Sequence, residues 1–537
     1  MNATNRKLLS GNQAVALACI DAGVHLGIGY PGTPSTEILE NFSLLGGNAQ
    51  WAPNEKVALE VGIGAAYANA RTLVTMKHVG LNVAADPLFT VAYTGVDGGL
   101  VLISADDPGM ASSQNEQDNR RYAPAAGIPM LEPADSHEAY DFTLQAIEIS
   151  ERWKIPVMLR MTTRICHSKT VVVQNESPSK PEPIHFERDI QGRVMIPAYA
   201  RPAHRKLREK LADLEKWNET CELNPVTRGK SSIGIITSGI SYVHAREAAP
   251  DANFLKLGVT YPIPMKTIED FAESVETCFV IEEGDSYLLE AIRANDIEVE
   301  GKPEMYRFGE LNVHRVRRIL KKDTSPEAQP PKGKPPQLCE GCPHRNVFTL
   351  LHELDCIVTG DIGCYTLGVL PPFNAMDTCV CMGASVGVGR GLRAVLPDEE
   401  ANRVVSVIGD STFIHSGITG VVDMVYNPPK TGHVLLILDN GTTAMTGLQE
   451  HPGTGRALDH HQTNQVVMED LCKAIGVKNV DVINPLKTDA FTDLLKNRLD
   501  KNELSVIIAR RPCVLAAPKI VQYEKAAAPT CDCQPAE

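Results

Sequence analysis

The stretch RVVSVIGDSTFIHSGITGVVDMVYNPPKTGHVLLILDN, residues 403–440, decides the fold class of this chain. Two apolar runs of strand length, 403–410 and 433–440, flank a segment that reads as a helix, 411–427. Apolar runs this continuous are typical of strands that are buried on both faces of a parallel sheet. The stretch therefore predicts a β-α-β unit in which a helix connects two neighbouring parallel strands.

The same alternation of strands and helices extends along the chain in both directions. Further buried strands are expected at 71–78, 99–107, 155–163, 231–239, 252–258, 277–284 and 504–511. We predict an α/β protein with three doubly wound domains, at 1–168, 231–323 and 339–518. Between and after these domains we expect a linker with an exposed helix at 169–230, a Pro/Lys-rich linker at 324–338 and a disordered tail at 519–537.

Composition and charge exclude several classes of function. The 537 residues carry 52 basic and 66 acidic side chains, and no block of Lys and Arg suggests nucleic-acid binding. No apolar run reaches the ~18 residues of a membrane-spanning helix, and the start of the chain lacks the pattern of a signal peptide. The fourteen cysteines are scattered rather than arranged as a disulfide framework. We expect a cytoplasmic protein with reduced thiols and no membrane span.

Two polar residues end the two strands of the deciding stretch. Asp410 follows Gly409 at the end of the first strand, and Asn440 ends the second. The carboxyl ends of parallel strands form the edge where open α/β sheets bind ligands, and Mg²⁺ prefers oxygen ligands from carboxylates, amides and phosphates. The helix after Asp410 also presents its first N–H groups to an anion. The pattern predicts a site for a divalent cation and a diphosphate, although a Gly-Asp strand end and an Asp-Asn-Gly turn also occur without any ligand.

These segments resemble those of a known enzyme family. Gly-Asp-Ser at 409–411, followed by Asn440, is similar to the thiamine-diphosphate motif, which has Gly-Asp-Gly and an Asn ~30 residues later. The segments 409–423 and 438–455 resemble the alpha subunit of the indolepyruvate:ferredoxin oxidoreductases, which are 2-oxoacid oxidoreductases. The resemblance implies a pyrimidine-binding domain at 1–168, a transketolase C-terminal-like domain at 231–323 and a diphosphate-binding domain at 339–518.

The resemblance assigns roles around the diphosphate. It implies that Mg²⁺ is bound by Asp410, Asn440 and the backbone carbonyl of Thr442. Ser411 stands where the motif has its second Gly. Met445 stands where the related pyruvate oxidoreductases have an active-site Asn, which favours a bulkier and more apolar substrate than pyruvate. The implied cofactor-binding residues are Glu60, His344, Gly363, Cys364, Gly383, Gly409, Asp410, Ser411, Asn440, Thr442 and Met445.

A Cys-rich segment, CEGCPHR at 339–345, opens the third predicted domain. A C-x-x-C pair indicates a metal site only when a matching second half follows, and Cys364, Cys379 and Cys381 are irregularly spaced. We therefore expect no metal cluster on this chain. The segment resembles the family's C-x-G-C-P/G-H motif, which implies that His344 contacts the diphosphate and that Gly-rich turns lie around the cofactor.

Thiamine diphosphate also needs a carboxylate beside its aminopyrimidine ring, in apolar surroundings that tune proton affinity. Glu60 is a rare acid in the apolar helix predicted at 57–70, and the segment 54–87 resembles the family's pyrimidine domain with Glu60 at the glutamate position. Glu55 is a rival, and Glu60 could instead be a partly exposed helix residue. The segment 30–35, Tyr-Pro-Gly-Thr-Pro-Ser, resembles a family loop in which the Thr contacts the substrate, which is Thr33 here.

Two further residues end the strand at 71–78. Lys77 and His78 could bind the carboxylate of a substrate, whereas His78 could equally be a strand-end histidine with internal hydrogen bonds. The catalytic residues expected from the sequence are Glu60, Thr33 and His78.

The resemblance implies oxidative decarboxylation of an aryl pyruvate, such as indolepyruvate or phenylpyruvate, to an acyl-coenzyme A. Related alpha subunits continue into a domain with two C-x₂-C-x₂-C-x₃-C-P runs, whereas this sequence has only Cys531 and Cys533 there. Iron–sulfur clusters are therefore expected on a partner chain. The implied partners are a smaller beta subunit and ferredoxin or another electron-transfer subunit, in a dimer of alpha–beta units. The alternatives are a non-oxidative 2-oxoacid decarboxylase and a scaffold subunit, and Glu60, Asp410 and Asn440 argue against the second.

Overall fold

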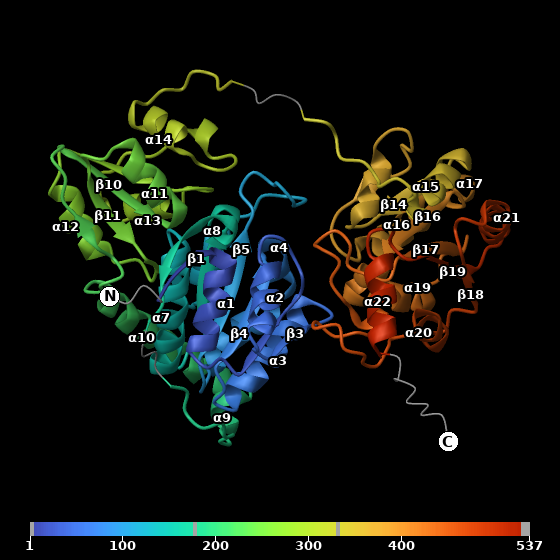
Figure 1. The fold of residues 1–537 in the computed structure, drawn as a ribbon, viewed down its shortest axis with the longest axis horizontal. Helices are drawn as coiled ribbons and strands as arrows, with labels where there is room; N and C mark the ends of the chain where they lie inside the picture. The colour runs from blue at the N-terminus through green and yellow to red at the C-terminus, as the bar shows by residue number, and fades with distance from the viewer. Residues whose placement is uncertain (1–4, 176–179, 329–332, 528–537) are drawn as a thin grey trace, which may run out of the picture. The chain divides into compact units, whose positions relative to one another are not determined.

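The computed structural model describes residues 5–175, 180–328 and 333–527. The chain forms two compact units, Met1–Gln329 and Pro330–Glu537 (Figure 1). The boundary falls inside the linker that the sequence predicts at 324–338. None of the helices in the described ranges is long and apolar enough to cross a membrane.

A seven-stranded sheet lies at the centre of the first unit. Its strand order is β12 (Val259–Tyr261), β6 (Met130–Leu131), β7 (Val157–Thr162), β5 (Leu100–Asp106), β4 (Thr72–Lys77), β2 (Leu26–Gly29) and β3 (Ala49–Trp51). All pairs are parallel except β12 with β6. Helices α3 (Glu55–Tyr67) and α7 (Ser136–Trp153) belong to the same α/β unit, and the strands predicted at 71–78, 99–107 and 155–163 are confirmed.

The predicted middle domain forms a second sheet within the same unit. Its order is β13 (Thr277–Ile281), β10 (Ile233–Ser238), β11 (Asn253–Leu257) and the short antiparallel β9 (Val226–Thr227). Strand β12 comes from this part of the sequence but joins the seven-stranded sheet. One apolar core contains residues of both sheets, so the two predicted domains pack as one unit.

A buried group of charged residues also connects the two sheets. Arg160, on β7, bonds to Asp106 at 2.9 Å and to Glu132 at 3.0 Å. Arg120 bonds to Glu282, just after β13, at 2.7 Å. All five side chains are buried. Buried charges are tolerated when they are paired in this way, so the contact between the sheets depends on the ionisation of its acids.

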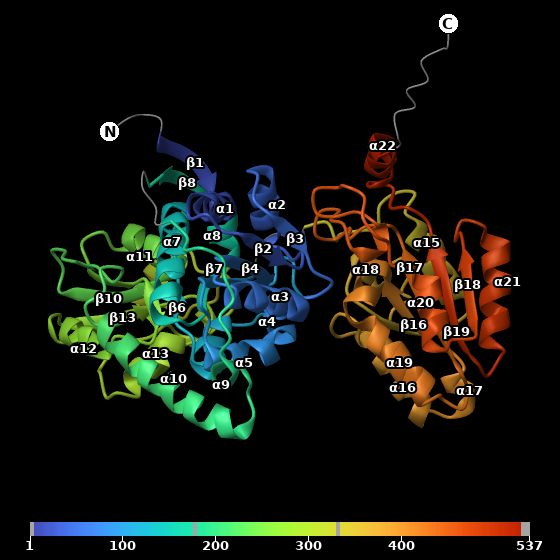
Figure 2. The same ribbon diagram turned by 90° about the horizontal axis from the view of Figure 1, so that it is seen from below.

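The segment 169–230, predicted as a linker with an exposed helix, contains the helix, but one side of that helix is buried. Strand β8 (Lys169–Val173) pairs with β1 (Arg6–Ser10). Helix α10 (Pro197–Asn218) can be followed in Figure 2, and its Leu207, Leu211 and Leu214 are buried in the core of the unit. The three leucines lie three and four residues apart and form a stripe along one side of the helix. Many other residues of the helix are charged, so this stripe is difficult to recognise in the sequence.

The second unit contains a parallel six-stranded sheet. Its order is β15 (Thr378–Cys379), β14 (Ile357–Gly360), β16 (Val404–Gly409), β17 (His433–Asp439), β19 (Leu504–Arg510) and β18 (Asn479–Ile483). Helices α15 (Pro343–Glu353) and α21 (Thr488–Leu499) pack on one face, and α16 (Ala384–Val395), α19 (Ile418–Tyr426) and α20 (Met468–Ile475) on the other. The predicted doubly wound arrangement is confirmed, with β16 and β17 adjacent.

The tail predicted at 519–537 is not disordered throughout. Helix α22 spans Ala517–Ala527. The Tyr523 ring stacks on His460 with centroids 4.1 Å apart, and the Ile520 side chain lies next to Gly441. The helix thus covers the turn that follows β17. Residues 528–537, including Cys531 and Cys533, lie outside the described ranges.

Candidate functional site

Asp410 joins the ends of the two central strands of the second unit. Its carboxylate is buried and accepts the backbone N–H groups of Asn440 at 3.2 Å and Gly441 at 2.8 Å. His451 lies 3.3 Å from the same oxygen, close enough for an ion pair although not aligned for a hydrogen bond. Burial raises the pKa of Asp410, but His451 and the N–H groups of Ser411 and Gly441 outweigh that effect and hold this pKa below its usual range.

The next turn brings further oxygen donors to this edge. The Asn440 side-chain oxygen accepts the Thr442 N–H at 3.1 Å, and the Thr442 hydroxyl donates to the Gln449 carbonyl at 3.1 Å. Asp410 supplies one carboxylate and Asn440 one amide oxygen. That donor set fits Mg²⁺, which is commonly held by one or two carboxylates, with waters and phosphates as the remaining ligands.

His344 lies in the first turn of α15, with its Nε2 atom 3.5 Å from the Asn440 amide nitrogen. Burial lowers the pKa of His344 to about 4, so the imidazole is neutral near pH 7. Asn440 therefore lies between a neutral ring and the Asp410 carboxylate. A neutral imidazole can donate one hydrogen bond to a phosphate oxygen.

The predicted Gly-rich turns meet at the same edge. Gly383 has a φ of +86°, and a Cβ there would lie 2.6 Å from the Ser416 hydroxyl, so a glycine is required. Its N–H donates to Asp361 at 2.9 Å. Gly363 and Cys364 precede Tyr365, a residue that the sequence did not single out.

Tyr365 connects two of the predicted segments. Its hydroxyl accepts the Gly409 N–H at 2.9 Å and donates to the Ile362 carbonyl at 3.0 Å. In the following loop, the Thr443 hydroxyl donates to that of Ser411 at 2.9 Å. Met445 is half exposed. The structure thus brings the predicted residues of this unit to one sheet edge.

Cysteines gather beside this edge in a way that the sequence did not reveal. The turn at 339–342 is closed by the Cys342 N–H, which donates to the Cys339 carbonyl at 3.2 Å. A Cβ on Gly341 in that turn would lie 3.8 Å from the Val514 side chain. Cys513, the residue before Val514, donates its N–H to the Asn440 carbonyl at 2.9 Å. One backbone hydrogen bond therefore connects a cysteine to the predicted cation ligand.

Cys364 completes this group. It precedes Tyr365, whose ring meets that of His344 edge-to-face with centroids 6.1 Å apart. Burial, followed by the charges of Cys513, Cys342 and Cys339, raises the pKa of Cys364 to about 11. The four-cysteine group thus consists of Cys339, Cys342, Cys364 and Cys513, and the exposed Cys379 and Cys381 are not among the residues that influence it. Cys513 was missed because it lies far along the sequence, although its position just after the strand at 504–511 places it at the same edge.

In the first unit, the structure contradicts the basis for choosing Glu60. The Glu60 side chain is 45% exposed and forms an ion pair with Lys56 one turn earlier, and Val61 and Gly64 are exposed beside it. Apolar neighbours in the sequence do not bury a helix residue that faces outward. The apolar burial expected for Glu60 is therefore wrong.

The rival Glu55 has the expected surroundings. It is 4% exposed and begins α3, which is capped by Asn54 at the carboxyl edge of the seven-stranded sheet. A Cβ on Gly80 would lie 2.5 Å from the Glu55 carboxylate. The side chain of Glu55 thus occupies the space that the glycine leaves free.

The other predicted residues of this unit differ in their surroundings. Thr33 is partly buried in the loop after β2. His78 is buried, and its Nε2 donates to the Asn115 carbonyl at 3.1 Å. Burial and the charge of Lys77 lower the pKa of His78 to about 4, so the ring is neutral near pH 7. The structure supports an internal role for His78 rather than the predicted binding of a carboxylate.

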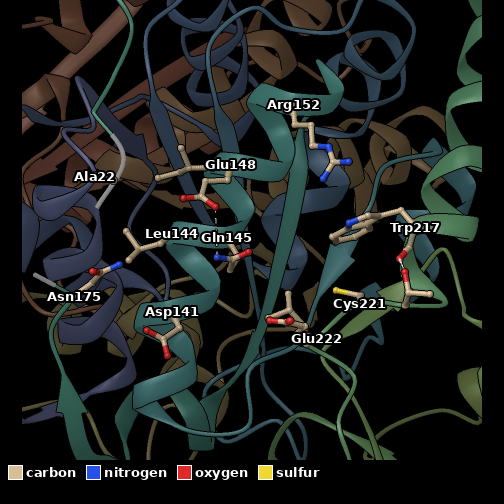
Figure 3. A pocket seen from close by; sticks show the side chains of 13 residues that line it. Ala22, Asp141, Leu144, Gln145, Glu148, Arg152, Asn175, Trp217, Cys221 and Glu222 are labelled. Carbon is tan, nitrogen blue, oxygen red and sulfur yellow. Dashed lines mark hydrogen bonds between the residues drawn. The ribbon is translucent and has the colours of Figure 1, made fainter. Parts of the chain in front are cut away.

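A separate pocket of about 490 Å³ lies in the first unit, between α7 and the end of α10 (Figure 3). Polar side chains such as Glu148, Arg152 and Asn175 line it, together with Trp217 and Cys221. None of the predicted site residues contributes to it.

Comparisons with known proteins give a match in each of the two units. Residues 17–210 match the family model "Pyruvate flavodoxin/ferredoxin oxidoreductase, thiamine diP-bdg", and residues 361–509 match "Thiamine pyrophosphate enzyme, C-terminal TPP binding domain". The solved 2-oxoglutarate:ferredoxin oxidoreductase from Magnetococcus marinus, at 16% identity, has a TM-score of 0.51 over 59% of this chain and 65% of its own. That likeness supports the fold alone.

Curated relatives extend the match along the chain. The indolepyruvate oxidoreductase subunit IorA of Archaeoglobus fulgidus is 40% identical over 94% of this chain and 86% of its own length. The IorA subunit of Thermococcus kodakarensis is 37% identical over 95% of this chain and 86% of its own length. The chain therefore belongs to the family of the indolepyruvate oxidoreductase subunit IorA, whose members are thiamine-diphosphate-dependent 2-oxoacid oxidoreductases.

Proposed function

We propose that this protein is the catalytic subunit that oxidatively decarboxylates an aryl pyruvate to an acyl-coenzyme A and passes the electrons to iron–sulfur clusters. The observation that carries the proposal is the four-cysteine group beside Asp410 and Asn440, because a non-oxidative decarboxylase has no use for such a group. The names of the relatives support indolepyruvate as substrate. Phenylpyruvate is proposed beside it as a second aryl pyruvate, and the half-exposed, apolar Met445 is compatible with an aromatic side chain.

Thiamine diphosphate, when bound, supplies the carbanion and the electron sink for decarboxylation. Asp410, Asn440 and the Thr442 carbonyl hold its Mg²⁺ in this proposal. The neutral His344 imidazole donates to a phosphate oxygen. Gly363, Cys364, Gly383, Gly409 and Ser411 form the turns around the diphosphate.

Glu55 replaces Glu60 as the carboxylate for the aminopyrimidine ring. Its burial and its place at the carboxyl edge of the sheet are the properties that the role requires. In this proposal the Glu55 carboxylate exchanges a proton with a ring nitrogen of the cofactor. Thr33, at the same edge, contacts the substrate.

Cys339, Cys342, Cys364 and Cys513 are proposed to hold a [4Fe–4S] cluster, which is bound by four cysteine thiolates. Among the described residues, no group of His, Cys, Asp or Glu is arranged for a single metal ion, and a cubane holds its four sulfurs farther apart than one ion does. This proposal revises the expectation that clusters are present only on a partner chain. The hydrogen bond between Cys513 and Asn440 gives electrons a short route from the cofactor.

The remaining proposals concern the assembly. Coenzyme A is the proposed acyl acceptor, and a smaller beta subunit and ferredoxin or another electron carrier are the proposed partners. The relatives are named as subunits, which supports a multi-subunit enzyme. We also propose a dimer of alpha–beta units and a cytoplasmic location, where thiols such as those of the free cysteines stay reduced.

Product analysis of the natively purified complex tests the proposed function. Phenylpyruvate or indolepyruvate is supplied with thiamine diphosphate, Mg²⁺ and coenzyme A, with and without a one-electron acceptor. The proposal predicts acyl-coenzyme A that forms only with the acceptor. Aldehyde that forms at the same rate without the acceptor would instead identify the alternative, a non-oxidative decarboxylase.

A further inference from the structure

We infer that Lys77 is the specificity residue that binds the carboxylate of the 2-oxoacid substrate. The inference rests on the proposed function and assigns one substrate contact to the first unit. It also separates the roles of Lys77 and His78, which the sequence named together as residues that could bind the substrate carboxylate.

The fold places Lys77 at the edge that carries Glu55 and Thr33. Strand β4 lies between β2 and β5, with Thr75 beside Gly29 and Lys77 beside Ala105. All three strands are parallel, so the loops after them meet at one edge. Lys77 is the last residue of β4, and its side chain leaves the sheet there.

The stem of Lys77 is held in place by the loop after β2. A Cβ on Gly32 would lie 3.2 Å from both Cγ and Cδ of Lys77. The aliphatic part of the lysine therefore packs along the backbone of the residue next to Thr33. A larger residue at position 32 would push the lysine aside.

The ammonium group of Lys77 retains donors for a ligand. Its Nζ donates one hydrogen bond, to the Ser112 carbonyl at 3.0 Å, and an ammonium has three N–H groups. Within the described ranges no carboxylate forms an ion pair with it. Burial lowers the pKa of Lys77, and the more distant charges of Asp107 and Glu55 oppose this effect.

Asp107, one of the two acids whose charges act on Lys77, is already occupied. The Asp107 carboxylate accepts the Ser112 N–H at 2.8 Å and the hydroxyls of Ser113 at 2.6 Å and Thr163 at 2.9 Å. A partly desolvated cation without an ionic partner gains most from an incoming anion that reaches it directly. A 2-oxoacid brings such an anion next to its reacting keto group.

His78 cannot supply this charge. Its ring is buried and neutral near pH 7, and its Nε2 atom already donates to the Asn115 carbonyl. The loop that carries Asn115 also carries Ser112. His78 thus holds the loop against which the Lys77 ammonium is positioned.

Substitution of Lys77 in the complete complex tests the inference. Lys77→Met keeps the length of the side chain along Gly32 and removes the charge, and Lys77→Arg keeps the charge. We expect Lys77→Met to lower kcat/KM for phenylpyruvate by about 10- to 100-fold, mainly through KM, and Lys77→Arg to restore much of it. The matched control is Lys56→Met, an exposed lysine of α3, which should change neither parameter.

A binding experiment separates the charge from other effects. 3-Phenylpropionate and its uncharged amide are titrated into the holoenzyme by calorimetry. The wild type should prefer the acid, and Lys77→Met should lose that preference. A Lys77→Met enzyme that keeps the wild-type preference would overturn the inference.

Hydrogen–deuterium exchange at the thiazolium C2 of the bound cofactor distinguishes a failure of the Lys77 inference from a failure of the proposed function. If Lys77→Met exchanges the C2 proton normally and still prefers the acid over the amide, the role of Lys77 is rejected and the proposed function stands. A wild-type complex that neither binds thiamine diphosphate nor exchanges the C2 proton rejects the proposed function itself.

Discussion

Two glutamates five positions apart show what decides a residue's role. Glu55 is buried at the start of α3, whereas Glu60 lies on the exposed side of the same helix. We predict that Glu55→Gln lowers kcat by about 10²- to 10⁴-fold, as expected when a group that transfers a proton is lost. Glu60→Gln is the matched control and should stay within twofold. Steady-state kinetics and C2 exchange measure both, and equal effects of the two substitutions would reject the assignment.

Gly80 provides an independent test of the same carboxylate. An added Cβ would lie 2.5 Å from the flexible end of Glu55, so Gly80→Ala should move that side chain rather than unfold the protein. We expect kcat to fall about tenfold or more with little change in Tm. Gly64→Ala in α3, where the added methyl meets no neighbour, should leave kcat intact and stabilise by up to about 1 kcal/mol. A Gly80→Ala enzyme with normal kcat would contradict this account.

At the residue scale, the sequence predicted that Asp410 and Asn440 meet at one sheet edge, because both follow strands that the apolar pattern locates well. It failed at Glu60 because an apolar segment does not reveal which side of a helix is covered. It also failed at the four-cysteine group, whose members are brought together only by the order of the strands.

At the scale of elements, strands buried on both faces were predicted correctly because each is a continuous apolar run. Helix α10 was predicted, but its burial was missed because charged residues outnumber its three buried leucines. Helix α22 was missed because its contacts are with loops, through Ile520 and Tyr523. Elements that are stabilised by only two or three side chains are difficult to predict from composition.

A prediction at this scale concerns Cys513, in the turn after β19. Cys513→Ser removes one of the four proposed cluster ligands, so the visible absorbance of an iron–sulfur cluster and the acceptor-dependent activity should both be lost. Cys379→Ser, at an exposed cysteine outside the group, is the control and should retain both. An unchanged cluster in Cys513→Ser would show that the four-cysteine group does not bind it.

At the scale of the whole molecule, the first unit is larger than either domain that the sequence outlined. Its two sheets share a core and the buried charges of Arg120 and Arg160. The sequence could not predict this because the partners are far apart along the chain. Stability of this unit should therefore respond to pH through buried acids.

Glu283 is one such acid, located just after β13. It is 4% exposed, and burial raises its pKa to about 7, against about 4.3 in an unfolded chain. At pH values between these two pKa values, the Glu283 carboxyl is protonated in the folded state and ionised in the unfolded state. The stability that goes with the protonated carboxyl is lost as pH rises towards 7.

Glu283→Gln keeps an oxygen for the Leu311 N–H, which Glu283 accepts at 2.8 Å. We expect the free energy of unfolding of the variant, relative to that of the wild type, to be higher at pH 8 than at pH 5.5 by on the order of 2 kcal/mol. Urea unfolding at the two pH values measures the difference. The control, Glu276→Gln at an exposed position, should show no such change, and a gain for Glu283→Gln that does not depend on pH would refute this view.

The hydrogen bond from Cys513 to the Asn440 carbonyl has a practical consequence for anyone who handles this enzyme. Oxygen that destroys the proposed cluster would free the cysteine turn and, with it, the turn that carries Asn440, a proposed ligand of the cation. Preparations made in air should therefore lose thiamine diphosphate along with iron. Adding thiamine diphosphate alone should not restore their activity. Fluorescence assay of thiamine and colorimetric assay of iron, followed during exposure to air, should decline together.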